Sequence, residues 1–260
     1  MSGVTVKGDG EGRTILDFSG QKGAGEGLLV TSSGVLVTGL TVRDSKGDGI
    51  KSKGSDRVSF TELTVEWTGG PKPTNGAYGV YPVSSTNVLI DRVTVRGASD
   101  AGIYVGQSKN IVVRHSLAEH NVAGIEIENC ANSEVYGNHA HGNTAGILVF
   151  KLVLPTQYSN CANVHDNLVE NNNLPNYGSG LVGDVPRGTG MLILSNDSSV
   201  FQNNVITGHD TFGIVLTDQN VLNLLFTPPP FPTPSPDPTS EHNYFVGNTQ
   251  TGNGGNPDPN

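Results

Sequence analysis

The chain has 260 residues, of which 35 are glycine, 35% are hydrophobic and only 15% are charged. Its net charge of −9, without any cluster of lysine and arginine, argues against a nucleic-acid partner. No apolar run is long enough to cross a bilayer, so we expect no membrane segment. This glycine-rich composition is typical of many short strands joined by tight turns, because glycine tolerates the positive φ that such turns require.

A short phrase, Ala-Gly-Ile, recurs at a fixed distance, with Ala101, Ala123 and Ala145 each 22 residues apart. A unit of this length cannot bury its own apolar face, whereas stacked units do so and form a solenoid. We therefore predict an all-β, single-domain parallel β-helix with about 22 residues per coil. In chain order, the glycines that open the repeated strand are Gly27, Gly49, Gly79, Gly102, Gly124, Gly146, Gly190 and Gly213.

The first expected coil starts at Val4, and no helix precedes it to cover its end. An uncovered coil exposes strand edges, which favours a homo-oligomer formed through this N-terminal coil. Met1 leads directly into polar sequence, without the apolar region of a leader peptide. If the protein is exported, we expect its leader to be absent from this chain.

Further along the chain, departures from the 22-residue period predict loop insertions near 67–75, 152–159, 171–187 and 219–240. The last of these carries the sequence TPPPFPTPSPDP, which we expect to be extended and polyproline-like. We expect the β-helix domain to span 1–248. The remainder, 249–260, is rich in glycine, asparagine and proline and predicts a flexible tail.

Strand alternation assigns the side chains of each coil to the inside or the outside. In the copy GIEI, Ile125 and Ile127 would point inward and Glu126 outward. The aliphatic character of the inward positions over eight copies supports the predicted stacking. The first inward column contains Leu28, Ile50, Val80, Ile103, Ile125, Ile147, Met191 and Ile214.

Asparagine and cysteine recur at the turns. Stacked asparagine side chains would hydrogen-bond along a ladder. Cys130 and Cys161 both lie in the phrase Asn-Cys-Ala-Asn, which aligns them on adjacent coils. Strands about 4.8 Å apart allow a disulfide but give it poor torsions, so two reduced cysteines and a disulfide are both open. The aligned asparagines are Asn87, Asn110, Asn132 and Asn163 in one series and Asn121 and Asn143 in another.

The outward positions predict where chemistry would be located. Their polar middle indicates an open groove, and their apolar C-terminal part indicates covering loops. The insertions 67–75 and 171–187 would form two walls roughly 20 Å apart, a length that suits several sugar rings. Trp67, on one wall, would either stack on a sugar or anchor its loop. The outward column contains Leu29, Lys51, Tyr81, Tyr104, Glu126, Leu148, Leu192 and Val215.

The phrases GASDAGIYVGQS, NVAGIEIEN and NTAGILVF resemble bacterial parallel β-helix domain proteins of unassigned activity. These belong to the right-handed parallel β-helix superfamily, which has the pectate-lyase-like fold. The resemblance runs from about Val4 to Asn248, nearly the whole chain. It implies a right-handed coil and a secreted or periplasmic protein that acts on, or binds, a polysaccharide or oligosaccharide.

Uronan lyases and C5-epimerases of this fold need a group that neutralises the sugar carboxylate, a base for the C5 proton and an acid for the leaving oxygen. If the reaction uses a metal, Ca²⁺ held by Asp100, Glu126 or Glu128 is the cofactor that these residues suggest. The candidate catalytic residues are Tyr104, Glu126, His120, Lys51 and Tyr81. The candidate substrate-binding residues are Trp67, Asp100, Glu128, Arg187 and His141.

Two other functions fit the same residues. A glycoside hydrolase would use paired carboxyl groups, such as Glu126 with Asp100 or Glu128. A non-catalytic glycan-binding or surface module would bind without turnover. The chain lacks the Asp-Pro-His-Asp motif of alginate epimerases, where the comparable coil reads YGVYPV, and the arginine-rich signature of pectate lyases. These departures weaken the enzymatic interpretations. Among those interpretations, a lyase or epimerase is the one that we favour.

Overall fold

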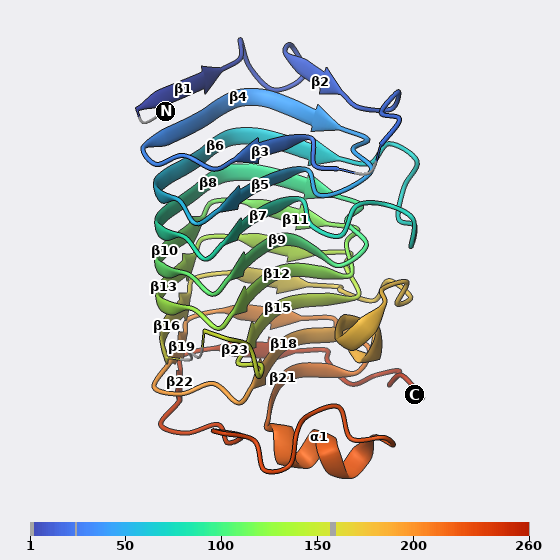
Figure 1. The fold of residues 1–260 in the computed structure, drawn as a ribbon. Coiled ribbons are helices and arrows are strands. Elements are labelled where there is room, and N and C mark those ends of the chain that lie inside the picture. The colour runs from blue at the N-terminus through green and yellow to red at the C-terminus, as the bar shows by residue number, and fades with distance from the viewer. Residues whose placement is uncertain (1–2, 24, 157–159, 260) are drawn as a thin grey trace.

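The computed structural model describes residues 3–23, 25–156 and 160–259, and it forms a parallel β-helix (Figure 1). Every described strand pair is parallel, as the stacked repeat predicts. One face of the coil is an eight-stranded sheet, called sheet B here. Its strands are β3 (Leu28–Val30), β5 (Ile50–Lys53), β7 (Val80–Val83), β9 (Ala101–Gly106), β12 (Ala123–Glu128), β15 (Ala145–Phe150), β18 (Thr189–Leu194) and β21 (Phe212–Thr217).

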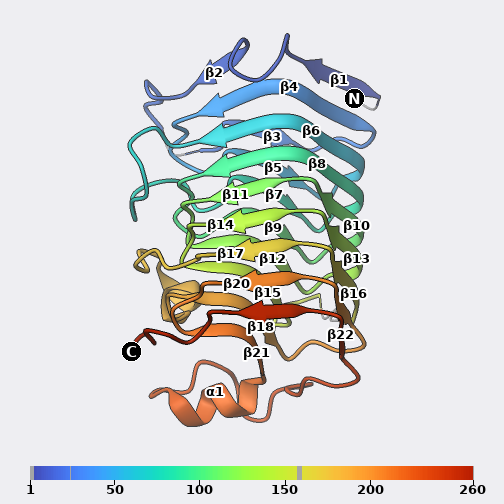
Figure 2. The same ribbon diagram turned by 180° about the vertical axis from the view of Figure 1, so that it is seen from behind.

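The remaining strands form the 15-stranded sheet A on the other faces of the coil (Figure 2). In three of the coils a single strand of 9 to 11 residues follows this path, and the other coils divide it into two shorter strands. The strands are β1 (Val4–Lys7), β2 (Ile15–Asp17), β4 (Val35–Arg43), β6 (Asp56–Glu66), β8 (Thr86–Arg96), β10 (Lys109–Arg114), β11 (Leu117–Glu119), β13 (Ala131–Tyr136), β14 (His139–His141), β16 (Asn160–His165), β17 (Leu168–Glu170), β19 (Val200–Gln202), β20 (Val205–Thr207), β22 (Tyr244–Val246) and β23 (Thr249–Thr251).

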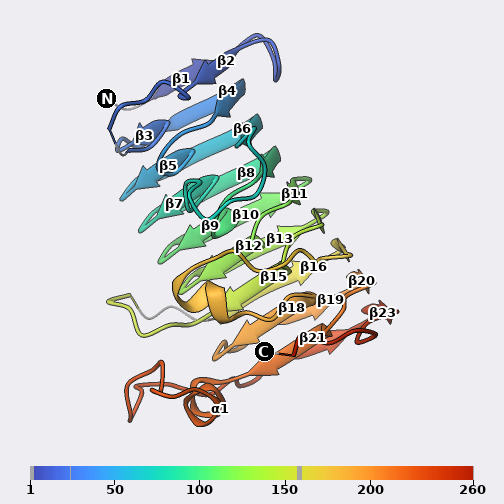
Figure 3. The ribbon, with the colours of Figure 1, turned by 90° about the vertical axis from the view of Figure 1, so that its right-hand side faces the viewer.

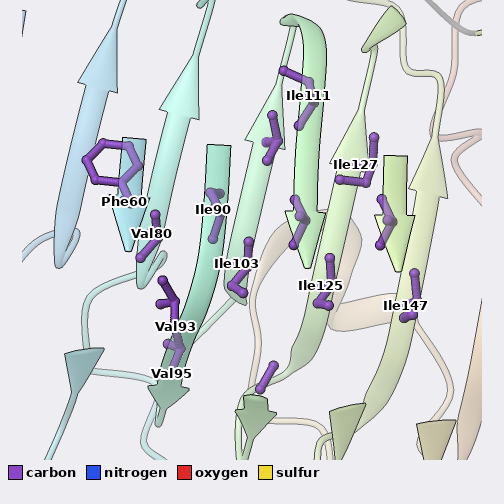
Figure 4. Close-up of a cluster of buried hydrophobic side chains, with 14 of the residues drawn as sticks. Phe60, Val80, Ile90, Val93, Val95, Ile103, Ile111, Ile125, Ile127 and Ile147 are labelled. Carbon is purple, nitrogen blue, oxygen red and sulfur yellow. The ribbon is translucent and has the colours of Figure 1, made fainter. Parts of the chain in front are cut away.

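The register confirms the predicted columns. Ile103, Ile125 and Ile147 are successive partners in β9, β12 and β15, and all three are buried inside the coil (Figure 4). The alternate residues of the same strands point outward, as the pleat requires. Each fully buried isoleucine contributes about 2 kcal/mol through burial of apolar surface, so the stacked columns hold the coils in register.

Asparagine ladders line the corners of the coil. The Asn110 amide donates to the Asn87 side chain (3.0 Å) and the Asn132 amide to the Asn110 side chain (3.2 Å). In a buried ladder, the Asn121 backbone N–H donates to the Asn143 side chain at 2.9 Å. These contacts satisfy corner N–H groups that neither sheet pairs.

Two of the predicted alignments are wrong. Asn163 lies opposite Glu134, not Asn132, and donates to its carboxylate at 3.0 Å. The insertion after β15 shifts the next coil by two positions. Cys161 therefore lies level with Asn132 and not level with Cys130. Cys130 is buried, Cys161 is exposed, and both are free thiols.

The insertions occupy the expected places, apart from 157–159, which lie outside the described residues. The 171–187 segment contains the 3-10 helix η1 (Gly180–Asp184). The 219–240 segment is not wholly extended, because it starts with the helix α1 (Gln219–Leu225), capped by the Asp218 carboxylate. Among the described residues, no helix is long and apolar enough to cross a membrane.

The stack continues past the boundary expected at residue 248. β23 pairs with β20, and the Gly254 N–H donates to the His209 carbonyl at 2.8 Å. The Asp258 N–H donates to the Thr211 hydroxyl at 2.8 Å. Part of the segment expected as a flexible tail is therefore bonded to the preceding coil.

Candidate functional site

The outward face of sheet B brings polar side chains from successive coils together. Lys51 of β5 lies opposite Tyr81 of β7, and Tyr104 of β9 lies opposite Glu126 of β12. Strands of a parallel sheet lie about 4.8 Å apart, so side chains 22 to 30 positions apart in the chain become direct neighbours. This is the outward column expected from the repeat.

Three tyrosines pack together on this face. The ring centroids of Tyr78 and Tyr81 lie 4.5 Å apart, those of Tyr78 and Tyr104 4.5 Å, and those of Tyr81 and Tyr104 4.9 Å. The Lys51 ammonium lies 4.6 Å from the centre of the Tyr81 ring, in a cation–π contact. Lys51 is also paired with Asp48 at 3.2 Å. The cluster therefore offers phenol groups beside a fixed positive charge.

Three carboxyl groups lie beneath and beside the tyrosines. Burial raises the pKa of Asp100 to about 7, while a hydrogen bond from the Tyr78 hydroxyl opposes that rise. Burial also raises the pKa of Glu126 well above its ordinary value, and the charges of Asp100 and Glu128 add to that rise. Desolvation disfavours the charged form, and neighbouring negative charges disfavour one another, so the pKa of each of the three carboxyl groups lies above its ordinary value.

Tyr104 and Glu128 are linked directly. The Tyr104 hydroxyl donates to Glu128 Oε1 at 2.5 Å. The Tyr104 ring packs over Gly106 on its way to this carboxylate. A Cβ added to Gly106 would lie 2.5 Å from Tyr104 Cε1. The strand therefore needs a glycine here for space, since any side chain would displace the ring.

The groove expected between two walls is not open along its length. Tyr104 and Glu126 are each only 5% exposed, and Glu128 is 7% exposed. The 171–187 segment covers this part of the face, where its Tyr177 hydroxyl donates to the carbonyls of Ala98 (2.7 Å) and His120 (2.9 Å). Solvent reaches the cluster from its N-terminal side, where Lys51, Tyr78, Tyr81 and Asp100 are partly exposed.

The structure does not bring all the candidate residues to this cluster. The His141 imidazole lies 3.1 Å from Glu119, and the His120 ring is its neighbour. Burial and the nearby His139 charge lower the pKa of His141. Arg187 lies further along the helix, where its guanidinium donates to Asp210 at 2.6 Å. These three residues precede later strands of sheet B, β12, β15 and β18, and not β7 and β9 beside the tyrosines.

Of the two roles expected for Trp67, stacking on a sugar or anchoring its loop, the structure supports the second. Its side chain is 5% exposed and belongs to the apolar interior. Its indole N–H donates to the Ser45 carbonyl at 2.7 Å. The residue therefore anchors the 67–75 loop and presents no free ring face for a sugar.

The expected calcium ligands are all part of this cluster. Among residues 3–23, 25–156 and 160–259, no three acidic, histidine or cysteine side chains are arranged to hold a metal ion. Glu128 Oε1 accepts the hydrogen bond from the Tyr104 hydroxyl. Calcium binding by Asp100, Glu126 and Glu128 stays a prediction.

Tyr78 was missed in the sequence. It stands immediately before the repeat glycine Gly79, the position that Asp48 holds before Gly49 in the preceding coil. An aligned repeat would have placed it beside the outward column. Its burial, followed by the charge of Asp100, raises the pKa of the Tyr78 phenol.

Comparison with known proteins supports the fold. A family model described as "Right handed beta helix region" matches residues 2–153. The A-module of the Azotobacter vinelandii mannuronan C-5 epimerase AlgE4 aligns with a TM-score of 0.56 and 12% identity, covering 96% of this chain and 80% of that one. The AlgE6 A-module from the same organism has a TM-score of 0.56 and 14% identity, covering 96% and 78%. No curated protein sequence matches the chain. The structural likeness shows the fold alone, and the family description confirms the right-handed coil.

Proposed function

The chain belongs to the family of right-handed β-helix regions, and we propose that it is a carbohydrate-active protein that transfers protons on a uronic-acid polymer. The site is the outward face of β5, β7 and β9. The two epimerase modules of the same fold, named for mannuronan, support a uronan as the substrate class. The same proposal places the protein outside the cytoplasm, where such polymers occur.

One observation carries this proposal: the largely buried Asp100 carboxyl group lies beside the Tyr78 phenol. The pKa of Asp100 is about 7, and Tyr78 is its hydrogen-bond partner. A neutral carboxyl group donates a hydrogen bond to the uronate carboxylate, which spreads the charge that develops when the C5 proton leaves. Asp100 therefore takes the role of neutralising the sugar carboxylate, which lyases and epimerases of this fold need.

Tyr81 is the base that the geometry favours. The pKa of its phenol is raised by burial, and the Lys51 ammonium, which lies against the ring, opposes part of that rise. Tyr104 has no such cation and is nearly inaccessible. In the lyase reaction, Tyr81 takes the C5 proton, the C4–O bond breaks and a C4–C5 double bond forms. The leaving oxygen takes its proton from Tyr78. In the epimerase reaction the C4–O bond stays intact, C5 takes up a proton from solvent on its opposite face, and Tyr81 returns its proton to solvent.

A glycoside hydrolase is the second candidate, and the raised pKa values of Asp100, Glu126 and Glu128 favour it. Hydrolysis needs one protonated and one ionised carboxyl group, which coupled titration of neighbouring acids supplies. The burial of Glu126 and Glu128 places both behind the tyrosines, so we rank this function below proton abstraction. A binding module without turnover is the third candidate.

Incubation with mannuronan, alginate, polygalacturonate and a neutral glycan in D₂O separates these functions. Deuterium at C5 without chain cleavage indicates an epimerase, and a new unsaturated uronate indicates a lyase. New reducing ends without unsaturation indicate a hydrolase. We expect Tyr81→Phe to lower turnover at least 100-fold, since removal of a proton-transfer group typically costs 10²–10⁴. Tyr244→Phe, at an exposed tyrosine in β22, is the matched control. Full activity of Tyr81→Phe, or no product from any uronan, would contradict the proposal.

A further inference from the structure

A second hollow lies on the outward face of sheet B, towards its C-terminal end, with a volume of about 1180 Å³. It is bounded on one side by the segment around η1 and on the other by α1, both of which stand beside sheet B in Figure 3. No residue of the acid and tyrosine cluster lines it. Its floor consists of Phe150, Leu192, Leu194 and Val215, and its walls include Leu181, Val185, Leu222 and Leu225.

The floor and walls are apolar, and two polar side chains among them, Asn176 and Thr189, already have partners. The Asn176 amide donates to three carbonyls of its own loop. The Thr189 hydroxyl donates to the Pro186 carbonyl at 2.7 Å. A sugar ring in this hollow would bury hydroxyl groups without partners, which costs free energy for each one. The hollow therefore suits an extended apolar chain of a size that a pocket of this volume accepts.

The charges at its edge select the head group of such a ligand. Arg187 is already paired with Asp210 at 2.6 Å. The Asp184 carboxylate is exposed and has no ion-pair or hydrogen-bond partner among the described residues. Asp258 adds a second carboxylate, which accepts from the Arg187 backbone N–H at 3.0 Å. The net negative edge repels an anionic head and attracts a positive one.

We propose that this hollow binds an aliphatic chain that carries a positively charged head group. The chain lies across Leu192 and Val215, between the η1 segment and α1, and the head lies at Asp184. This binding is separate from the proton-transfer site and does not depend on the proposed function. A fatty-acid anion of the same length would place its carboxylate against Asp184 and Asp258 and would bind more weakly.

Alkyltrimethylammonium ions of increasing chain length, kept below their micelle concentrations, are the probes, and titration calorimetry on the full chain measures their binding. Each added methylene should tighten binding about fourfold until the hollow is filled, because each buries a further apolar group. The alkyl carboxylate of equal length should bind at least tenfold more weakly. Asp184→Asn should reduce that preference for the cationic head.

Two matched tryptophan variants locate the binding. Val215→Trp fills the floor of the hollow and should weaken binding at least tenfold. Leu29→Trp occupies the same outward column at the other, exposed end of sheet B and should leave binding unchanged. Thermal unfolding checks that both variants are folded. Equal binding by the two variants, carboxylates that bind as tightly as ammonium ions, or no binding by the folded wild-type chain would each overturn the proposal.

Discussion

Glu126 is buried at 5% exposure, and its Oε2 atom has no hydrogen-bond partner among the described residues. Desolvation therefore raises its pKa, with Asp100 and Glu128 adding to the effect. Between the ordinary and the raised pKa, the folded chain binds more protons than the unfolded chain. Stability from this residue is consequently full at acid pH and is lost as the pH rises through that window.

Glu126→Gln keeps the shape of the side chain but cannot ionise. We expect its free energy of unfolding to exceed that of the wild type at pH 8 and to match it near pH 4. Urea unfolding at both pH values measures the difference. Glu62→Gln, at an exposed outer-face glutamate, should show no such pH dependence. A Glu126→Gln variant that is equally destabilised at both pH values would contradict the assignment.

Asp100 gives the proposed reaction its pH dependence. The working form is protonated, and the pKa is about 7. Tyr81 must be ionised to act as the base, so turnover should rise with pH below about 7 and level off above it, where the loss of protonated Asp100 offsets the gain in ionised Tyr81. Asp100→Asn retains a hydrogen-bond donor, so its residual turnover should keep rising above pH 7. A wild-type rate that rises through pH 7 as steeply as that of Asp100→Asn would exclude Asp100 from the reaction.

Gly106 leaves the space that Tyr104 needs to reach Glu128. A Cβ at this position would lie 2.6 Å from the Tyr104 hydroxyl oxygen. We expect Gly106→Ala to destabilise the chain by about 1–3 kcal/mol, as overpacking does. Chemical denaturation measures the change. Gly20→Ala is the control, because no atom lies within 4 Å of its added Cβ. Equal stability of the two variants would show that the ring moves aside without cost.

For single residues, the repeat pattern predicted the face on which a side chain lies better than it predicted the exposure of that side chain to solvent. Lys51, Tyr81, Tyr104 and Glu126 share one face because alternation and a 22-residue period determine which way each side chain points. Their burial depends on the loop that carries Tyr177, and no local pattern shows where a loop packs. The open groove expected in the sequence was therefore wrong at its centre.

The buried asparagine ladder continues through a histidine. The Asn172 backbone N–H donates to His209 Nδ1 at 3.3 Å, and His209 Nε2 lies 3.1 Å from the Val169 carbonyl. This pattern requires a neutral ring whose proton is on Nε2. Desolvation lowers the pKa of His209 to about 4. Between the ordinary pKa of histidine and about 4, the unfolded chain therefore binds a proton on this imidazole that the folded chain does not bind. The free energy of unfolding consequently falls as the pH falls through this range.

His209→Asn would continue the ladder with the residue found in the preceding coils. We expect it to remove a stability loss on the order of 3 kcal/mol between pH 7 and pH 4. Thermal unfolding across this range measures the slope. His242→Asn, at an exposed histidine, should keep the wild-type slope. Identical pH dependence of the wild type and His209→Asn would refute the role of the ring.

At the scale of elements, repeated strands were predictable and isolated elements were not. The strands recur, so eight copies support each assignment. α1 is a single short helix that Asp218 caps, and its seven residues are too few to show a helical period. The shift of Cys161 by two positions follows from an insertion of unknown length, which the repeat alone does not measure.

The whole molecule divides its sheet B face into two environments. The N-terminal part presents phenols, an ammonium group and carboxyl groups, whereas the C-terminal part is apolar and is lined by two insertions. The right-handed coil was predictable from the resemblance and is shown by the family match. Which of the two environments carries out the biological task depends on chemistry that the fold alone does not determine.

A crystal structure of the Tyr81→Phe variant with an oligouronide tests the proposed site most directly. The account predicts sugar density over β5, β7 and β9, with a uronate carboxylate at Asp100 and its C5 atom facing the place of the missing hydroxyl. Density for the sugar on sheet A or in the apolar hollow, with this face empty, would contradict it.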